Sequence, residues 1–358
     1  MSIFRVTDGL NTDSACSATR CRCSRHDNPF ARRPPPWQGR RVRYESITRP
    51  DGAFQQSLTA EQMVAVCRRG FGRAPVSVVE LHGGSFNTTY RVDLGGQEVI
   101  LRVAPQWSYR IERGFMRHEH AALPFFAPIA DLVPRTLFVD FTRDLVPRDY
   151  TFQTLLGGLP GPEGLRALSD RPGFFRQLGE IVRTVHGVRG ERFGRPAGPM
   201  FATWSETVLS IVDDTVADMN DAGLDSADMR EVAVLAAKNT AVLDEITQPR
   251  LLHGDLWVPN VRVAGERIVG VFDHDRAMWG DPAADWTLYA AGRRPGTDRD
   301  AFWDTYGRPP QSRDAVWRAA LYRAVNVGAV RIERHRLGLA DTIPASYQEM
   351  AGVLAELR

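Results

Sequence analysis

The chain has 358 residues, of which 43% are hydrophobic and 25% are charged, with a formal net charge of +2. This is the composition of an ordinary soluble protein long enough for two lobes, and no apolar run approaches the roughly 18–20 residues of a membrane helix. Four cysteines are too few for a disulfide scaffold, and the first thirty residues lack the apolar segment of a signal peptide, so we expect a cytoplasmic protein.

The charge is unevenly distributed along the chain. Residues 1–50 contain ten arginines against four acidic residues, a net of +6, so residues 51–358 carry −4. A mildly acidic folded part disfavours nucleic acid as a partner and allows a cationic ligand. We therefore expect no nucleic-acid partner and, without an apolar span, no membrane partner. The oligomeric state is expected to be a monomer or a homodimer.

Residues 1–50 are predicted to be a disordered arm rich in Arg and Pro, because they show no periodic apolar face. Cys16, Cys21, Cys23 and His26 are conceivable metal ligands. Their spacing matches no common zinc pattern and a second ligand pair is missing, which favours a plain arm.

Residues 51–157 are predicted to form a first lobe, a five-stranded antiparallel sheet with a helix. A capping box of Thr59 and Gln62 begins a short helix ahead of the sheet. The turn Gly83-Gly84-Ser85 could let backbone N–H groups approach phosphates, although a plain hairpin turn is the commoner use of such a sequence. The expected strands are 76–81, 86–94, 98–103, 134–140 and 149–156, with the helix at 112–123.

Residues 158–358 are predicted to form a second, mainly helical lobe that contains one β-hairpin. The hairpin consists of 261–263 and 268–272, joined by an Ala-Gly-Glu-Arg turn. The predicted fold class is therefore α+β, with two lobes. The expected helices are 174–188, 201–222, 227–246, 281–291, 298–306, 312–336 and 344–357.

The hairpin is expected to bring three polar side chains together. Asp255 and Asn260 precede its first strand and Asp273 follows its second, so the three should converge on one side of a small sheet. Two carboxylates and an amide are hard oxygen ligands that suit Mg²⁺. They also suit phosphoryl transfer, in which a protein mostly positions groups and neutralises charge.

Together these residues resemble the signature of the aminoglycoside phosphotransferase family of small-molecule kinases, over about residue 78 to the C-terminal helices. The resemblance implies the bilobal protein-kinase-like fold and ATP- and Mg²⁺-dependent phosphorylation of a hydroxyl group, with GTP as an alternative donor. The acceptor would be an aminoglycoside-like or other antibiotic, a sugar or an amino alcohol. The motif residues are His253-Gly254-Asp255, Asn260, Asp273, Gly280-Asp281-Pro282 and Asp285.

The resemblance also assigns roles. Asp255 resembles the catalytic aspartate that orients the substrate hydroxyl, and Asn260 and Asp273 resemble the Mg²⁺ ligands. Glu119 resembles the helix glutamate that pairs with a strand lysine, but this sequence has Arg102 at that lysine position. The arginine could contact phosphates or only brace Glu119.

The missing lysine motivates an alternative function, a non-catalytic nucleotide-binding module of the same fold. In both cases the turn Gly83-Gly84-Ser85 would cover the phosphates. The backbone from Thr154 to Leu156 would form the hinge against the adenine.

Substrate contacts are less specifically indicated. Asp214 and Asp218 share a helix face and could receive ammonium groups, although an acidic run is usually a solvated face. Trp257 lies inside the catalytic loop and is a candidate pocket wall. Asp275 could be an accessory ligand or a substrate contact, or face solvent.

The remaining polar residues of the motif have structural interpretations. Asp281 before a proline has the pattern of a helix N-cap, Asp285 is expected to be structural as well, and His253 is expected to brace the loop. A metal-dependent hydrolase that also used His274 is disfavoured, because His274 should point away from Asp273 on the opposite strand face.

Overall fold

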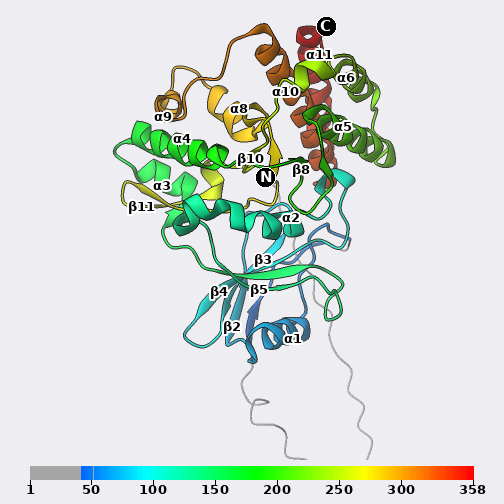
Figure 1. Ribbon diagram of the computed structural model, residues 1–358. Helices are drawn as coiled ribbons and strands as arrows, with labels where there is room; N and C mark the ends of the chain where they lie inside the picture. Colours follow the sequence, from blue (N-terminus) through cyan, green and yellow to red (C-terminus); the bar gives the residue numbers. More distant parts are fainter. Residues whose placement is uncertain (1–41, 51) are drawn as a thin grey trace, which may run out of the picture. The chain divides into compact units, whose positions relative to one another are not determined.

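The computed structural model describes residues 42–50 and 52–358 (Figure 1). Residues 42–358 form one compact unit. The four candidate metal ligands of the arm, Cys16 to His26, lie outside the described residues. Within the described part, no helix is both long and apolar enough to cross a membrane.

A mixed sheet forms the first half of this unit. Its six described strands lie in the order β1-β2-β3-β4-β6-β5. Strands β2 to β6 are antiparallel to their neighbours and lie within two residues of the expected positions. The bounds are Arg43–Glu45 (β1), Ser77–Glu80 (β2), Thr88–Asp93 (β3), Glu98–Val103 (β4), Thr136–Asp140 (β5) and Tyr150–Thr154 (β6).

Strand β1 corrects two expectations, because the sheet is neither five-stranded nor wholly antiparallel. It pairs with β2 in parallel and comes from a stretch that was expected to be disordered. Tyr44 donates to Leu58 O at 2.5 Å, and Glu80 accepts hydrogen bonds from Ile47 N and the Arg49 guanidinium. A strand of three residues is too short to show a period in the sequence, so long-range contacts place it.

Helix α1 (Ala60–Phe71) packs on this sheet, and α2 (Phe115–Ala122) follows it in the chain (Figure 1). The predicted capping box of Thr59 and Gln62 is present at the start of α1. One apolar cluster unites α1 with the sheet, and its buried members include Met63, Val66, Val78, Tyr90, Leu101 and Phe152. Short 3-10 helices at Arg110–Glu112 (η1) and Leu123–Leu132 (η2) flank α2.

The predicted hairpin is present and receives a third strand. Strands β11 (Val261–Ala264) and β12 (Arg267–Val271) pair with each other, and β7 (Leu159–Pro160) pairs with β11. The chain continues from β7 into α3 (Gly161–Ala167). Gly164 of α3 lies so close to β11 that a Cβ added to it would be 2.5 Å from the side chain of Val263. Helix α3 therefore packs directly against the hairpin.

A second small sheet was not expected from the sequence. It supports the segments on both sides of the hairpin, because β10 lies just before Asp255 and β13 lies just after Asp273. The order is β10-β13-β8-β9. The bounds are Phe193–Gly194 (β8), Met200–Phe201 (β9), Arg250–Leu252 (β10) and Met278–Gly280 (β13).

The rest of the second half is helical, as expected, and the fold class is confirmed as α+β. The expected helix 227–246 is divided at Asn239 into α6 and α7, and α8 and α9 each begin after a 3-10 turn. Helices α5, α6, α10 and α11 share one buried apolar cluster. The bounds are Arg171–Gly187 (α4), Trp204–Asp221 (α5), Ala227–Lys238 (α6), Thr240–Leu243 (α7), Trp286–Gly292 (α8), Phe302–Tyr306 (α9), Arg313–Arg336 (α10) and Ile343–Leu357 (α11).

Candidate active site

A cavity of about 1030 Å³ lies between the first sheet and the helical half. The sheet side contributes the turn after β2, side chains of β3 and β4, and the end of β6. The helical side contributes the loop after β10, the segment after β12, and faces of α5 and α10. Asp255, Asn260 and Asp273 all line this one cavity.

Asp285 fixes the loop that carries Asp255. Its carboxylate accepts from the backbone N of His253 at 2.9 Å and of Gly254 at 3.2 Å, and it also contacts His186. Gly254 has φ +81°, and a Cβ there would lie 2.5 Å from Arg276 O. The loop conformation therefore requires glycine between the histidine and the aspartate.

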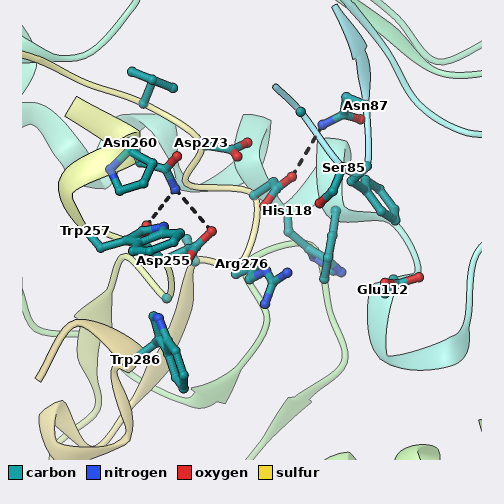
Figure 2. A pocket seen from close by; sticks show the side chains of 18 of the residues that line it. Ser85, Asn87, Glu112, His118, Asp255, Trp257, Asn260, Asp273, Arg276 and Trp286 are labelled. Atoms are coloured by element: carbon teal, nitrogen blue, oxygen red, sulfur yellow. Dashed lines mark hydrogen bonds between the residues drawn. The ribbon is translucent and has the colours of Figure 1, made fainter. Parts of the chain in front are cut away.

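Asn260 links the two ends of the hairpin. Its Nδ2 donates to Asp255 O at 2.8 Å and to Asp255 Oδ2 at 3.1 Å (Figure 2). Its backbone carbonyl accepts from Phe272 N at 3.1 Å, which places Asp273 next to it. The structure thus brings together the three residues that the hairpin pattern was expected to join. The amide nitrogen of Asn260 makes these bonds, and its amide oxygen accepts no hydrogen bond from the described residues, so it can act as a ligand.

The environment of Asp255 weakens its acidity. Burial, together with the negative charges of Asp273 and Glu333, raises the pKa of Asp255 to about 7, although Arg276 opposes the change. A carboxylate with this pKa is a better proton acceptor than an exposed aspartate and is still about half ionised at neutral pH.

Arg102 on β4 lies between three carboxylates. Its Nη1 is 2.5 Å from both oxygens of Glu119, and its Nη2 is 2.5 Å from Asp273 Oδ1 and 3.6 Å from Asp275 Oδ2. Burial alone would lower the pKa of Arg102, but the three carboxylates outweigh it and raise the pKa. Arg102 therefore contacts both Glu119 and Asp273, not Glu119 alone.

Asp275 is buried and does not face solvent. Asn87 Nδ2 lies 3.4 Å from its Oδ2. Burial and the neighbouring Asp273 raise the pKa of Asp275 well above its usual range. The residue lines the cavity on the side of the turn after β2.

The turn at residues 83–85 also lines the cavity, and it is held by α10. Gly83 has φ +102°. Ser85 O accepts from Arg336 Nη1 at 2.6 Å, and Ser85 Oγ lies 3.3 Å from Glu333 Oε1. At the opposite edge Thr154 and Leu156 line the cavity, but the Thr154 amide already donates to Arg135 O at 2.9 Å.

The acidic residues of α5 proposed to receive ammonium groups are not brought to the cavity, and Asp218 binds backbone amides instead. Asp218 is 1% exposed, and it accepts from the backbone N of Arg110 and Ile111, each at 3.0 Å. The N–H groups at the start of η1 need such an acceptor. Of the described residues that line the cavity, none is Asp214 or Asp218.

Two tryptophans are drawn in the same part of the cavity as Asp255 in Figure 2. Trp257 lines the cavity and is 43% exposed. Trp286, the first residue of α8, also lines the cavity and was not anticipated. Trp286 directly follows Asp285, the N-cap of α8. The Asp-Trp pair after the Gly-Asp-Pro motif was therefore the sequence signal that could have placed Trp286 at the cavity.

Two arginines were missed as well. Arg276 lies three residues after Asp273, and Arg195 lies in a loop between β8 and β9 with no helical or strand period. Both line the cavity. The position of Arg276 in the motif stretch was a usable signal, whereas nothing local marks Arg195.

The residues expected to be structural are placed accordingly. Asp281 caps η4 (Pro282–Ala284), accepting from Ala283 N at 3.0 Å. His253 is buried, and burial with the neighbouring His274 lowers its pKa to about 4. His274 is wholly buried against Phe126 and does not line the cavity, which disfavours the hydrolase.

The donor set was compared with the needs of a metal. Among the described residues, no group of three or more His, Cys, Asp and Glu side chains could hold an ion. Mg²⁺ needs less from a protein, because it is commonly held by one or two carboxylates plus water and substrate phosphates. The free oxygen of Asn260 and the carboxylate of Asp273 fit that requirement, and they do not fit a metal site made of protein ligands alone.

A family model described as the phosphotransferase enzyme family matches residues 77–321. No curated protein sequence matches the chain significantly.

Solved structures share the fold over most of the chain. A thermostable mutant of aminoglycoside phosphotransferase APH(4)-Ia, in a ternary complex with AMP-PNP and hygromycin B, is 18% identical, with a TM-score of 0.60, 82% of this chain covered and 98% of that chain. A protein of Haemophilus somnus 129PT assigned as a fructosamine-3-kinase is 15% identical (TM-score 0.59; 82% and 97% covered). The GDP complex of an aminoglycoside 2'-phosphotransferase-IIIa mutant is 17% identical (TM-score 0.57; 83% and 98% covered).

Proposed function

The chain belongs to the phosphotransferase enzyme family, and from this premise we propose that it transfers the γ-phosphate of ATP to a hydroxyl group of a small molecule. The reaction would require Mg²⁺, and GTP is the alternative donor. We assign nucleotide binding mainly to residues 51–157, and catalysis with acceptor binding mainly to residues 158–358.

One observation supports this proposal most strongly. Asp255, Asn260 and Asp273 line the same cavity as the turn at Gly83 and the arginine of β4. A base for the acceptor hydroxyl and oxygen ligands for a cation thus face groups that suit phosphates, as phosphoryl transfer requires.

Asp255 would accept the proton of the acceptor hydroxyl. Its pKa near 7 suits a base at neutral pH, and Asn260 Nδ2 holds its carboxylate in one orientation. Asn260 Oδ1 and Asp273 would hold Mg²⁺, which when bound neutralises charge on the phosphates.

The sheet side would bind the nucleotide. The backbone of the turn at residues 83–85 would cover the phosphates, and the backbone near Thr154 to Leu156 would meet the base. Since the Thr154 amide is used by Arg135, the hinge contacts would come from its carbonyl and from the two leucines. Arg102 would hold Glu119 through Nη1 and reach Asp273 in the cavity through Nη2.

The nucleotides bound by similar proteins support this assignment. The APH(4)-Ia mutant carries AMP-PNP together with hygromycin B, and the 2'-phosphotransferase-IIIa mutant carries GDP. These ligands were bound by those proteins and not by this chain. They make ATP, GTP and antibiotics the first compounds to test.

The test is nucleotide consumption by the full chain over hydroxyl compounds, with and without Mg²⁺. We expect Mg²⁺-dependent release of ADP and a new phosphate monoester by ³¹P NMR. Nucleotide binding without any turnover would instead favour the non-catalytic module. Hydrolysis of an ester without nucleotide would contradict both.

A further inference from the structure

One end of the cavity is mostly apolar. It is formed by η1, α2, α5 and α10, and we call it the helical end. Elements η1 and α2 belong to the first half of the chain, and α5 and α10 belong to the second. The apolar lining residues are Ile111, Phe115, Trp204, Val208, Ile211, Val325, Ala329 and Val330.

Two guanidinium groups lie at this helical end. The Cζ of Arg195 is 5.6 Å from the ring centroid of Phe115, and the Cζ of Arg276 is 5.8 Å from the same centroid. Arg276 is also close enough to Asp255 to lower its pKa, and Figure 2 shows the two side by side. The shared ring of Phe115 places the two guanidinium groups at the same end of the cavity, with Arg276 the one next to the proposed base.

The carboxylates at the helical end are already paired. Glu112 Oε1 accepts from Arg336 Nε at 2.8 Å, and Glu333 lies 3.4 Å from Arg276 Nη2. The second oxygen of Glu112 has no hydrogen-bond partner among the described residues, so it could accept from a hydroxyl group. Asp255 is the reacting group, so the carboxylates named here leave an ammonium no ion-pair partner beyond that one oxygen of Glu112.

Arg195 differs from these residues. Its guanidinium donates to the carbonyls of Ile111 and Arg113. None of the carboxylates in the described part of the chain lies within salt-bridge distance of it, although Asp214, Asp218 and Glu112 attract it from further away. Burial lowers the pKa of Arg195 to about 10, so it stays charged at neutral pH. A guanidinium that faces a cavity with no carboxylate at salt-bridge distance favours an anionic ligand and disfavours a cationic one.

We propose that the acceptor is a hydroxyl compound with an oxyanion, a carboxylate or a phosphate, on a largely apolar skeleton, and that Arg195 binds the oxyanion. This rests on the proposed function, because it names the acceptor class of the same cavity. It excludes polycationic aminoglycosides as the preferred acceptors.

The first experiment uses the unmodified full chain with MgATP and matched acceptors. One series is 4-(hydroxymethyl)benzoate, its primary amide and 4-(aminomethyl)benzyl alcohol. A second series is 6-hydroxyhexanoate, its amide, 6-aminohexanol and the monophosphate of 1,6-hexanediol. Kanamycin and hygromycin B complete the panel.

We expect kcat/KM to be at least tenfold higher for an acid or phosphate than for its amide, and lowest for the amine. Comparing 6-hydroxyhexanoate with the monophosphate of 1,6-hexanediol shows whether a carboxylate or a phosphate is preferred. Equal rates, a preference for the amines or aminoglycosides, or no acceleration by any acid would overturn the proposal.

The second experiment compares Arg195→Gln with Arg192→Gln. Arg192 is exposed, and its partners among the described residues are the backbone carbonyls of Phe201 and of Met200, the latter at 3.1 Å. Losing a charged hydrogen bond should raise KM for the best anionic acceptor about 10- to 100-fold in Arg195→Gln, with KM for its amide and for ATP unchanged. Arg195→Lys should recover part of the affinity, and Arg192→Gln should change nothing.

A purely structural Arg195 would give a different result. Since it braces η1 through two carbonyls, its loss would then lower melting temperature and impair acid and amide turnover alike. If Arg195→Gln does not fold, the acid and amide comparison on the unmodified chain still decides the proposal.

Failure of this proposal is distinct from failure of the proposed function. ATP turnover with a preference for amines or aminoglycosides would overturn the acceptor class and leave the phosphotransferase assignment standing. Absence of nucleotide binding and of turnover with every compound would overturn both.

Discussion

The guanidinium of Arg102 reaches across the cavity to Asp273, with 2.5 Å between Nη2 and Oδ1. The same side chain contacts Glu119 through its other terminal nitrogen. An arginine at this place therefore binds a residue proposed to hold Mg²⁺, so the ion and Arg102 would compete for one carboxylate.

Replacing Arg102 should separate these two roles. Arg102→Lys has one nitrogen, so it can keep Glu119 but cannot also hold Asp273, and we expect tighter Mg²⁺ binding in the presence of ADP. Calorimetric titration of Mg²⁺ would measure this. An unchanged or weaker affinity would contradict the competition.

Arg102→Met should instead destabilise the fold. It leaves the carboxylate of Glu119 buried without its cation, which costs about 3–5 kcal/mol in free energy of unfolding. Urea unfolding measures the loss. Arg358→Met is the matched control, because Arg358 pairs with Glu231 at the surface and should lose no more than about 1 kcal/mol.

The pKa of Asp255 near 7 predicts the pH profile. A base must be ionised, so kcat/KM should fall as the pH drops below about 7 and reach a plateau above it. A profile that is flat between pH 5.5 and 8 would contradict the role of Asp255.

The same shift predicts the stability of Asp255→Asn. A carboxyl whose folded pKa is raised binds its proton more tightly in the native state, so it costs stability as the pH rises from about 4 towards 7. The neutral variant should therefore melt at a higher temperature than the original chain at pH 8, and the difference should shrink at pH 5. Asp213→Asn, an exposed change on α5, should show no such trend.

Asp218 should matter for stability. Asp218→Ala leaves the amides of Arg110 and Ile111 without their acceptor, at about 1–3 kcal/mol for each buried group. We expect a lower free energy of unfolding in urea and an unchanged preference among charged acceptors. If Asp218→Ala kept its stability but lost binding of cationic acceptors, the result would instead support an ammonium-binding role for Asp218.

The sequence was most informative where chemistry and short-range pattern coincide. Asp255, Asn260 and Asp273 could be expected to meet because a hairpin of two short apolar runs joins its own ends. Strand β4 was predicted to the residue because its apolar run is bounded by the Gly95-Gly96 turn and by Pro105. The Arg102 and Glu119 pair was expected from the family resemblance, and the structure contains it.

What the sequence did not show depends on contacts between distant segments. Strand β1 and the sheet of β8, β9, β10 and β13 are too short to carry a period. Asp218 looked like a solvated helix residue until η1 was placed against it. Arg195 lies in an irregular loop, and its position at the cavity depends on how β8 pairs with β13.

The central claim is that Asp255 is the base of a phosphoryl transfer, and Asp255→Asn tests it most directly. Transfer of ³²P from γ-labelled ATP to the best acceptor should fall at least about a thousandfold. The dissociation constant for MgATP should stay within about threefold, because Asp255 is not among the residues proposed to bind the nucleotide. Transfer within tenfold of the original rate, with nucleotide binding intact, would contradict the claim.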